Sequence, residues 1–315
     1  MSKEFAVRPR FRVLIDNDFG GDPDGLVQLA HHLLSPTVEI PGIIVSHLRK
    51  DDAWAKGTDG IDRGIQFVND LLDKTGKLGI PVLRGSNDPM LDIDSPVDSE
   101  AVDFILKEID RDSLLPLFIV CGGSLTQVAS AYLRSPSKFE DVTIVWIGGA
   151  EHDGIGISTY DAPQLEYNTH EDVSAAQVIF NKSDLTLWQV PRNTYRQALV
   201  SFAELDLRLK GNGDLGDYLR DKLVETINWW DNEGRLLGET YCLGDSPLVL
   251  LTALHTSYEP DPGSSTYKEI SCPELLTSGA YKPNIKGRKI RVYDFVDTRL
   301  MFEDFFNKVT LLASR

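Results

Sequence analysis

The chain has 315 residues and 42% hydrophobic content, enough to bury the core of one large α/β domain or of two modest ones. No linker separates a second unit, so we expect a single domain over residues 1–315. The formal net charge is −16, from 32 Lys and Arg against 48 Asp and Glu. This balance argues against nucleic acid as a partner, because nothing would neutralise its phosphates.

The three cysteines have neither the spacing of a zinc site nor that of a redox CxxC pair; they are Cys121, Cys242 and Cys272. An odd count of this kind is typical of a reducing compartment. The first residues carry charge and no apolar segment of a signal peptide, and no apolar run reaches membrane length. We therefore expect a cytoplasmic protein without a membrane partner.

The first predicted strand, residues 13–15, opens onto a cluster of carboxylates, and a helix is predicted directly after it at 26–34. The four carboxylates are Asp16, Asp18, Asp22 and Asp24. A single acidic residue at a helix start is often a cap, but capping uses only one. Four like charges repel one another unless a cation, a proton or a sugar hydroxyl lies among them. The cluster therefore predicts a hard-metal site, most simply for Ca²⁺.

Further along the chain, strands alternate with helices, and small or polar residues follow most strands. Strands are predicted at 38–45, 81–83, 117–120, 142–147, 185–190 and 289–294. Helices are predicted at 54–72, 101–109, 125–133, 173–180, 203–230 with a break at 211–216, 247–254 and 302–312. Residues 151–164 are glycine-rich and polar, which is typical of a loop over a site.

This alternation predicts a single α/β domain with a mostly parallel sheet and helices on both faces. Ligands of such sheets bind beyond the carboxyl ends of the strands, where the polar clusters fall. One enzyme class with a strand ending in Asp-x-Asp is the Mg²⁺-dependent aspartyl-nucleophile phosphatases. That class needs a later acidic pair, and the segment around Asp245 supplies one carboxylate without a partner.

A second family agrees with many segments in the same order. The segment DNDFGGDPD at 16–24 resembles the DTDPGIDDA cluster of the inosine-uridine nucleoside hydrolases. Six further segments resemble the family's PVxxG, GPLTN, MGGA, EFN, DPEAA and late HDP motifs: PVLRG (81–85), GSLTQ (123–127), IGGA (147–150), EYN (166–168), DVSAA (172–176) and DSP (245–247). The resemblance covers the chain to about residue 253.

The resemblance implies a Ca²⁺ ion and a ribose site. The implied metal ligands are Asp18, Asp24, Asp245 and the backbone carbonyl of Thr126. The implied ribose ligands are Asp22, Glu166 and Asn168. In this chemistry the metal lowers the pKa of a bound water, Asp18 takes its proton, and hydroxide attacks C1′ as the N-glycosidic bond breaks. Carboxylates then stabilise the oxocarbenium-like ribosyl group.

Two features depart from the family pattern. Pro23 separates Asp22 from Asp24, so either carboxylate can reach the metal. Gly244 stands where the family has an imidazole acid, which leaves protonation of the leaving group unassigned. Three histidines near strand ends are candidates for this acid: His47, His152 and His170.

Other side chains have structural as well as functional interpretations. His31 and His32 lie in the first helix, where one of them is expected to face solvent. Trp229, Trp230 and Tyr241 could stack on a base, although an aromatic pair in a helix is more often part of a core.

We therefore predict a Ca²⁺-dependent hydrolase that cleaves ribonucleosides to ribose and free base. The alternative is a metal-dependent ribose- or sugar-binding protein of the same fold without turnover, suggested by Gly244. A small-molecule nucleoside or ribosyl substrate and a homo-oligomeric state are also expected.

Overall fold

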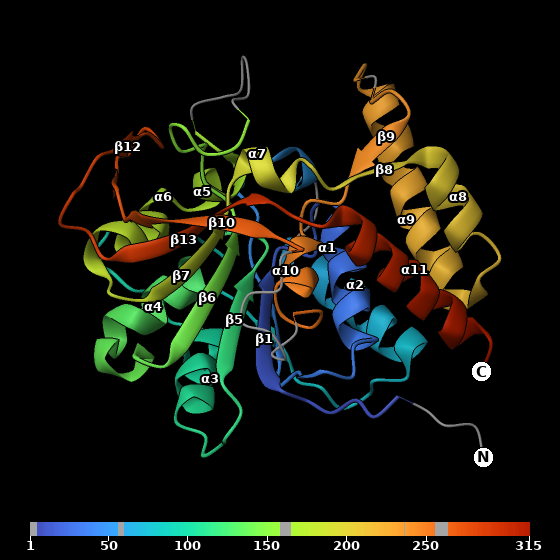
Figure 1. The fold of residues 1–315 in the computed structure, drawn as a ribbon, viewed down its shortest axis with the longest axis horizontal. Coiled ribbons are helices and arrows are strands. Elements are labelled where there is room, and N and C mark those ends of the chain that lie inside the picture. Colours follow the sequence, from blue (N-terminus) through green and yellow to red (C-terminus); the bar gives the residue numbers. More distant parts are fainter. Residues whose placement is uncertain (1–4, 56–59, 158–164, 236, 256–263) are drawn as a thin grey trace.

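The computed structural model describes residues 5–315 except 56–59, 158–164, 236 and 256–263. Within these residues one central sheet has the strand order β10-β13-β7-β6-β5-β1-β3-β4, with β2 beside β1 (Figure 1). Its strands are β1 Phe11–Asn17, β2 Val38–Glu39, β3 Ile43–Val45, β4 Val82–Arg84, β5 Leu117–Cys121, β6 Val142–Ile147, β7 Thr186–Val190, β10 Thr266–Ser271 and β13 Lys289–Phe295. Neighbouring strands are parallel except β10 and β13.

Helices cover both faces of the sheet. The helices that contribute to the core on one face are α1 Asp24–Leu33, α2 Gly60–Thr75, α8 Phe202–Leu209, α9 Gly213–Asn232, α10 Pro247–Leu250 and α11 Thr298–Ala313. Those of the other face are α3 Glu100–Ile109, α4 Thr126–Arg134 and α6 Val173–Gln177. Along β1, Val13 and Ile15 enter the first core and Leu14 the second. Burial on both faces explains why the strands are almost continuously apolar, and the predicted fold class is confirmed.

Short elements complete the described chain. Two small antiparallel pairs are β8 Leu199–Ser201 with β9 Thr240–Cys242, and β11 Glu274–Leu275 with β12 Tyr281–Lys282. The short helices are α5 Tyr167–Glu171 and α7 Arg192–Tyr195. Two 3₁₀ turns occupy Ala53–Ala55 and Pro136–Phe139, and a π-helical turn occupies Val178–Lys182.

Several predicted boundaries are wrong for local reasons. The run 38–45 forms two strands rather than one, with Pro41, which has no N–H to donate to a sheet, between them. The helix expected at 247–254 ends at Leu250. Strand β10 was not predicted, because its sequence, TYKEIS, is polar. This composition suits its position at the exposed edge of the sheet. In the predicted loop 151–164, residues 151–157 contain no helix or strand, and the remainder lies outside the described residues.

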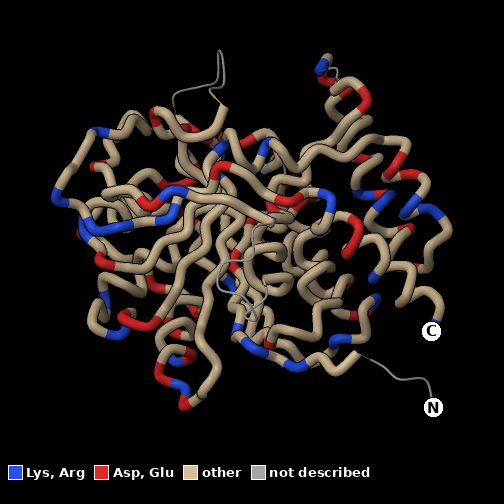
Figure 2. The backbone as a smooth tube through the Cα atoms, viewed as in Figure 1, with Lys and Arg blue, Asp and Glu red and all other residues tan. Residues whose placement is uncertain are grey.

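The sheet register brings the carboxyl ends of the central strands together. Asp16 near the end of β1 pairs with Ile44 of β3 and with Cys121 of β5. Acidic and basic residues are interspersed over the outer helices (Figure 2). Among the described helices, none combines the length and apolar character needed to cross a bilayer.

Candidate active site

A cavity of about 510 Å³ opens where the central strands end. It is lined by most of the carboxylates and amides singled out in the sequence: Asp18, Asp22, Asp24, Glu166, Asn168 and Asp245. They come from three separate stretches of the chain, 18–24, 166–168 and 245, which the fold brings to one edge of the parallel sheet. Gly122 and Ile147, which follow β5 and end β6, complete the side nearest the sheet.

A tight turn after β1 positions the acidic cluster. The N–H of Gly21 donates to the carbonyl of Asp18 at 2.7 Å. A Cβ on Gly20 would lie 2.0 Å from the carbonyl oxygen of Gly60, so only glycine allows the turn to pack against the start of α2. The turn leads directly into α1, whose first residue is Asp24.

The inserted Pro23 sends its two neighbouring carboxylates to different partners. Asp24 Oδ2 accepts a hydrogen bond from the N–H of Asp245 at 3.2 Å. Asp22 Oδ1 accepts from the Tyr241 hydroxyl at 2.9 Å and from the N–H of Asp24 at 3.1 Å. Asp24 is therefore the neighbour of Asp245, whereas Asp22 is tied to strand β9.

Asp245 lies between β9 and α10, and a hydrogen bond from the end of β1 fixes its side chain. Its Oδ2 accepts from Asn17 Nδ2 at 2.8 Å. A Cβ on Gly122 would lie 2.3 Å from Asn17 Nδ2 and 2.7 Å from Asp245 Oδ2. The absence of a side chain at position 122 thus allows β5 to approach this pair closely.

Glu166 and Asn168 are fixed by the backbone around them. Glu166 caps α5, accepting at Oε2 from the N–H of Gly149 at 2.7 Å and of Thr169 at 2.9 Å. Its Oε1 accepts from the Tyr195 hydroxyl at 3.0 Å. Asn168 Nδ2 donates to the carbonyls of Gly122 at 2.9 Å and Ile147 at 2.7 Å. Both donor hydrogens of this amide are therefore used by the protein.

Two residues of the sequence motifs lie away from the cavity. Thr126 is the first residue of α4, and its hydroxyl donates to Asp172 Oδ2 at 2.6 Å. It is fully buried and does not line the cavity, where the backbone of Gly122 lies instead. Asp16 is also buried elsewhere, with its Oδ1 bonded to the Ser46 hydroxyl and its Oδ2 without a hydrogen-bond partner in the described structure. Burial raises the pKa of Asp16 to about 7.

The carboxylates of the cavity raise one another's pKa values. Burial, and then repulsion from Glu171 and Asp245, raises the pKa of Asp18 well above its usual range. Burial and the charge of Asp245 do the same for Asp24. Burial raises the pKa of Asp245 to about 7 and that of Asp22 to about 6. Within the described residues no Lys, Arg or His side chain forms an ion pair with any of these four groups.

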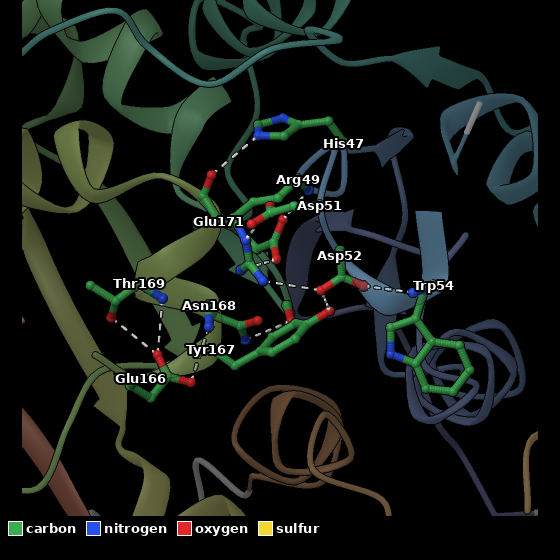
Figure 3. A network of polar contacts seen from close by, with 11 residues as sticks. His47, Arg49, Asp51, Asp52, Trp54, Glu166, Tyr167, Asn168, Thr169 and Glu171 are labelled. Atoms are coloured by element: carbon green, nitrogen blue, oxygen red, sulfur yellow. Dashed lines mark hydrogen bonds and ion pairs between the residues drawn. The ribbon is translucent and has the colours of Figure 1, made fainter. Parts of the chain in front are cut away.

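A second polar network, which the sequence did not reveal, joins the segment after β3 to α5 (Figure 3). Three of its members, Arg49, Asp52 and Tyr167, line the cavity. Arg49 pairs with Glu171 at 2.7 Å and with Asp52 at 3.2 Å. The Tyr167 hydroxyl donates to Asp52 Oδ2 at 2.9 Å, and the Arg49 guanidinium lies 5.5 Å from the centre of the Tyr167 ring. These contacts fasten the segment after β3 to α5, beside Asn168.

Aromatic side chains from distant segments form another part of the lining. Trp54 lies with its ring centre 5.4 Å from that of Trp230, at an interplanar angle of 85°. Trp54 and Trp230 both line the cavity, and the Arg235 guanidinium lies 4.3 Å from the centre of the Trp230 ring. The half-buried Trp230 therefore belongs to the site rather than to the core.

Comparison with known proteins agrees with this geometry. The family model of the inosine-uridine preferring nucleoside hydrolases matches residues 13–300. The chain belongs to this family. The resemblance seen in the motifs is thus confirmed over nearly the whole length of the chain.

Similar proteins include solved structures and one curated sequence. The plant nucleoside hydrolase PpNRh1 has a TM-score of 0.73 at 19% identity, over 96% of this chain and 99% of that one. The purine-preferring ribonucleoside hydrolase from Gardnerella vaginalis has a TM-score of 0.73 at 20% identity, over 96% and 99%. These structural likenesses show the shared fold. The uncharacterized protein C1683.06c of Schizosaccharomyces pombe is 25% identical over 215 residues, 60% of this chain and 64% of that protein's length.

The position of the family's imidazole acid is occupied differently in this member. Among the described residues no histidine lines the cavity. His47 Nε2 contacts the carbonyl of Glu171 at 3.4 Å, and His152 bonds to Gln189 at 2.8 Å beside a separate cavity. A Cβ on Gly244 would lie 3.3 Å from Cδ2 of Tyr195, so the tyrosine ring fills the space beside this glycine.

Proposed function

We propose that this nucleoside hydrolase family member is a Ca²⁺-dependent hydrolase that cleaves the N-glycosidic bond of ribonucleosides to ribose and free base. The observation that supports the proposal is the group of carboxylates, none of them in an ion pair within the described residues, that lines a cavity large enough for a nucleoside. Family membership supports the reaction class.

The side chains present fit a hard divalent cation. Asp18, Asp24 and Asp245 offer only oxygen ligands, which Ca²⁺ prefers, and their mutual repulsion would be relieved by a positive charge. Among the described residues no three His, Cys, Asp or Glu side chains are gathered closely enough to hold an ion by themselves. Asp18, Asp24 and Asp245 would hold the ion, with the nearby Gly122 carbonyl as a further oxygen in place of Thr126, which does not line the cavity. The ion would supply acidity to a bound water.

The chain's own residues account for binding and proton transfer. Asp18, at the end of β1, is the proton acceptor for the attacking water. Asp22 and Asn168 offer their free oxygens to ribose hydroxyls. Glu166 Oε1 accepts from the Tyr195 hydroxyl and from the N–H of Asn168, and a ribose hydroxyl can replace the tyrosine there. The surrounding negative charge favours an oxocarbenium-like ribosyl group over neutral substrate.

A riboside panel tests the hydrolase. Purified protein with Ca²⁺ should release free ribose from one or more purine, pyrimidine or p-nitrophenyl ribosides, and a chelator should abolish the release. No ribose from any member of the panel would contradict the proposal.

A second candidate is a ribose-binding protein of the same fold without turnover. It is favoured by the absence of a histidine from the cavity lining of the described structure and by the packing of Tyr195 against Gly244. Calorimetric binding of ribose in Ca²⁺, together with no ribose release from the panel, would support this candidate over the hydrolase.

The raised pKa values predict how the stability of the metal-free protein depends on pH. A carboxyl whose folded pKa exceeds its unfolded value stabilises the fold below the unfolded pKa and loses that contribution as pH rises through the folded one. For Asp22 and Asp245 the usual value is 3.8 and the folded values are about 6 and about 7. The melting temperature in a chelator should therefore fall by several degrees between about pH 5 and about pH 8.

Saturating Ca²⁺ should remove most of this fall. Ligand at about 100 times its Kd adds about 2.7 kcal/mol to the free energy of unfolding. Differential scanning calorimetry with and without Ca²⁺ measures both effects. A melting temperature that rises with pH in the chelator would be the opposite of the expected sign.

A further inference from the structure

A continuous row of buried polar side chains runs from the carboxylate cluster into the helices behind it. The row consists of Asn17, Gln28, His32 and Thr252, and each of these side chains is fully buried. Asn17 ends β1, Gln28 and His32 lie one turn apart on α1, and Thr252 follows α10. Burying four polar side chains in an apolar core is unfavourable unless each finds a partner.

The hydrogen bonds of this row have a single consistent direction. The N–H of Asp18 donates to Asn17 Oδ1 at 2.8 Å, which fixes the amide orientation. Asn17 Nδ2 can then donate to Asp245 Oδ2 at 2.8 Å and to Gln28 Oε1 at 3.3 Å. Gln28 Nε2 consequently donates to His32 Nδ1.

The same direction fixes the state of the imidazole. Because His32 Nδ1 accepts, its hydrogen lies on Nε2 and is donated to Thr252 Oγ1 at 3.0 Å. The Thr252 hydroxyl in turn donates to the carbonyl of Leu248 at 2.6 Å. Burial lowers the pKa of His32 well below its usual range, consistent with a neutral ring. Every donor atom in the row therefore has at least one acceptor.

This finding corrects the expectation for the two histidines of the first helix. Neither faces solvent: His31 is 1% exposed and His32 is 0% exposed. They turn to different partners, however. His31 Nε2 bonds to Asp304 of α11 at 2.8 Å and takes no part in the row.

We propose that Asn17, Gln28 and His32 are positioning residues for Asp245. They hold its Oδ2 as a hydrogen-bond acceptor, so that the other carboxylate oxygen is presented to the cation. The inference rests on the proposed function, because it assumes a cation among these carboxylates. Mutation of hydrogen-bond partners that orient a metal ligand commonly lowers metal affinity by about 10–100-fold.

The matched histidines allow a direct test. His32→Leu and Gln28→Met, which break the row, are expected to weaken Ca²⁺ binding by roughly 10-fold or more in isothermal titration calorimetry. The control is His31→Leu, on the same helix and equally buried, which should keep the affinity within about twofold of wild type. The conservative His32→Asn, whose Oδ1 can take the place of Nδ1 as acceptor, should recover part of the loss.

Calorimetric unfolding of each variant separates positioning from loss of structure. All three disruptive variants should melt at lower temperature, and only the two in the row should lose Ca²⁺ affinity. Unchanged Ca²⁺ affinity in folded His32→Leu and Gln28→Met would overturn the proposal, as would an equal loss in His31→Leu or no Ca²⁺ binding by the wild type. Failure of the hydrolase proposal gives a different result: no ribose release, with Ca²⁺ binding and its dependence on the row intact.

Discussion

Asp18→Asn is expected to lower kcat/KM for nucleoside hydrolysis by roughly 10³-fold or more, because it removes both the negative charge of a metal ligand and the proton acceptor. The change keeps the size of the side chain and removes repulsion with Glu171 and Asp245, so the metal-free fold should be as stable as wild type or more stable. Steady-state ribose release and calorimetric unfolding measure the two effects.

The control is Asp141→Asn, an exposed position before β6 and away from the cavity. It should retain wild-type kinetics. Activity of Asp18→Asn within about tenfold of wild type would remove Asp18 from the role of base.

Gly122→Ala should have the second-largest effect, although it adds a single methyl group. The new Cβ would lie 2.3 Å from Asn17 Nδ2 and 2.7 Å from Asp245 Oδ2. Both side chains must therefore move away from residue 122. Overpacking of this kind costs about 1–3 kcal/mol of stability. The displaced carboxylate should lower kcat/KM by about 100-fold, as expected for a misplaced catalytic group, and should weaken Ca²⁺ binding.

Gly76→Ala is the matched control for this substitution. Gly76 follows α2 with φ +66°, and a Cβ there meets no atom within 4 Å. The free energy of unfolding of this control should fall by about 1 kcal/mol because of backbone strain, and its activity should equal that of wild type. Wild-type kinetics in Gly122→Ala would show that the Asn17–Asp245 pair need not be held where the structure has it.

The parts of the fold that depend on local pattern could be predicted from the sequence. Strand β1 and the carboxylates after it are adjacent in the chain, so apolar alternation and a cluster of Asp were enough. The order of the family motifs along the chain was enough to single out three further site residues, Glu166, Asn168 and Asp245. The parallel sheet then gathers them, because it places the ends of its strands along one edge.

The rest depends on long-range packing that leaves no local signal. Gly122 contributes its backbone and its lack of a Cβ, and neither has a characteristic side-chain pattern. Tyr195 contacts Glu166 and the space beside Gly244 because α7 follows β7 of the central sheet, and neither contact lies close in the sequence. The helical pattern of α1 predicted a solvent-facing histidine, but α10 and α11 cover both His31 and His32.

A crystal structure of the protein soaked with Ca²⁺ and ribose tests the central claim most directly. We predict one ion bound to Asp18, Asp24 and Asp245, with a ribose whose hydroxyls contact Asp22 and Asn168. An ion bound elsewhere, or a ribose that leaves these carboxylates untouched, would contradict the account.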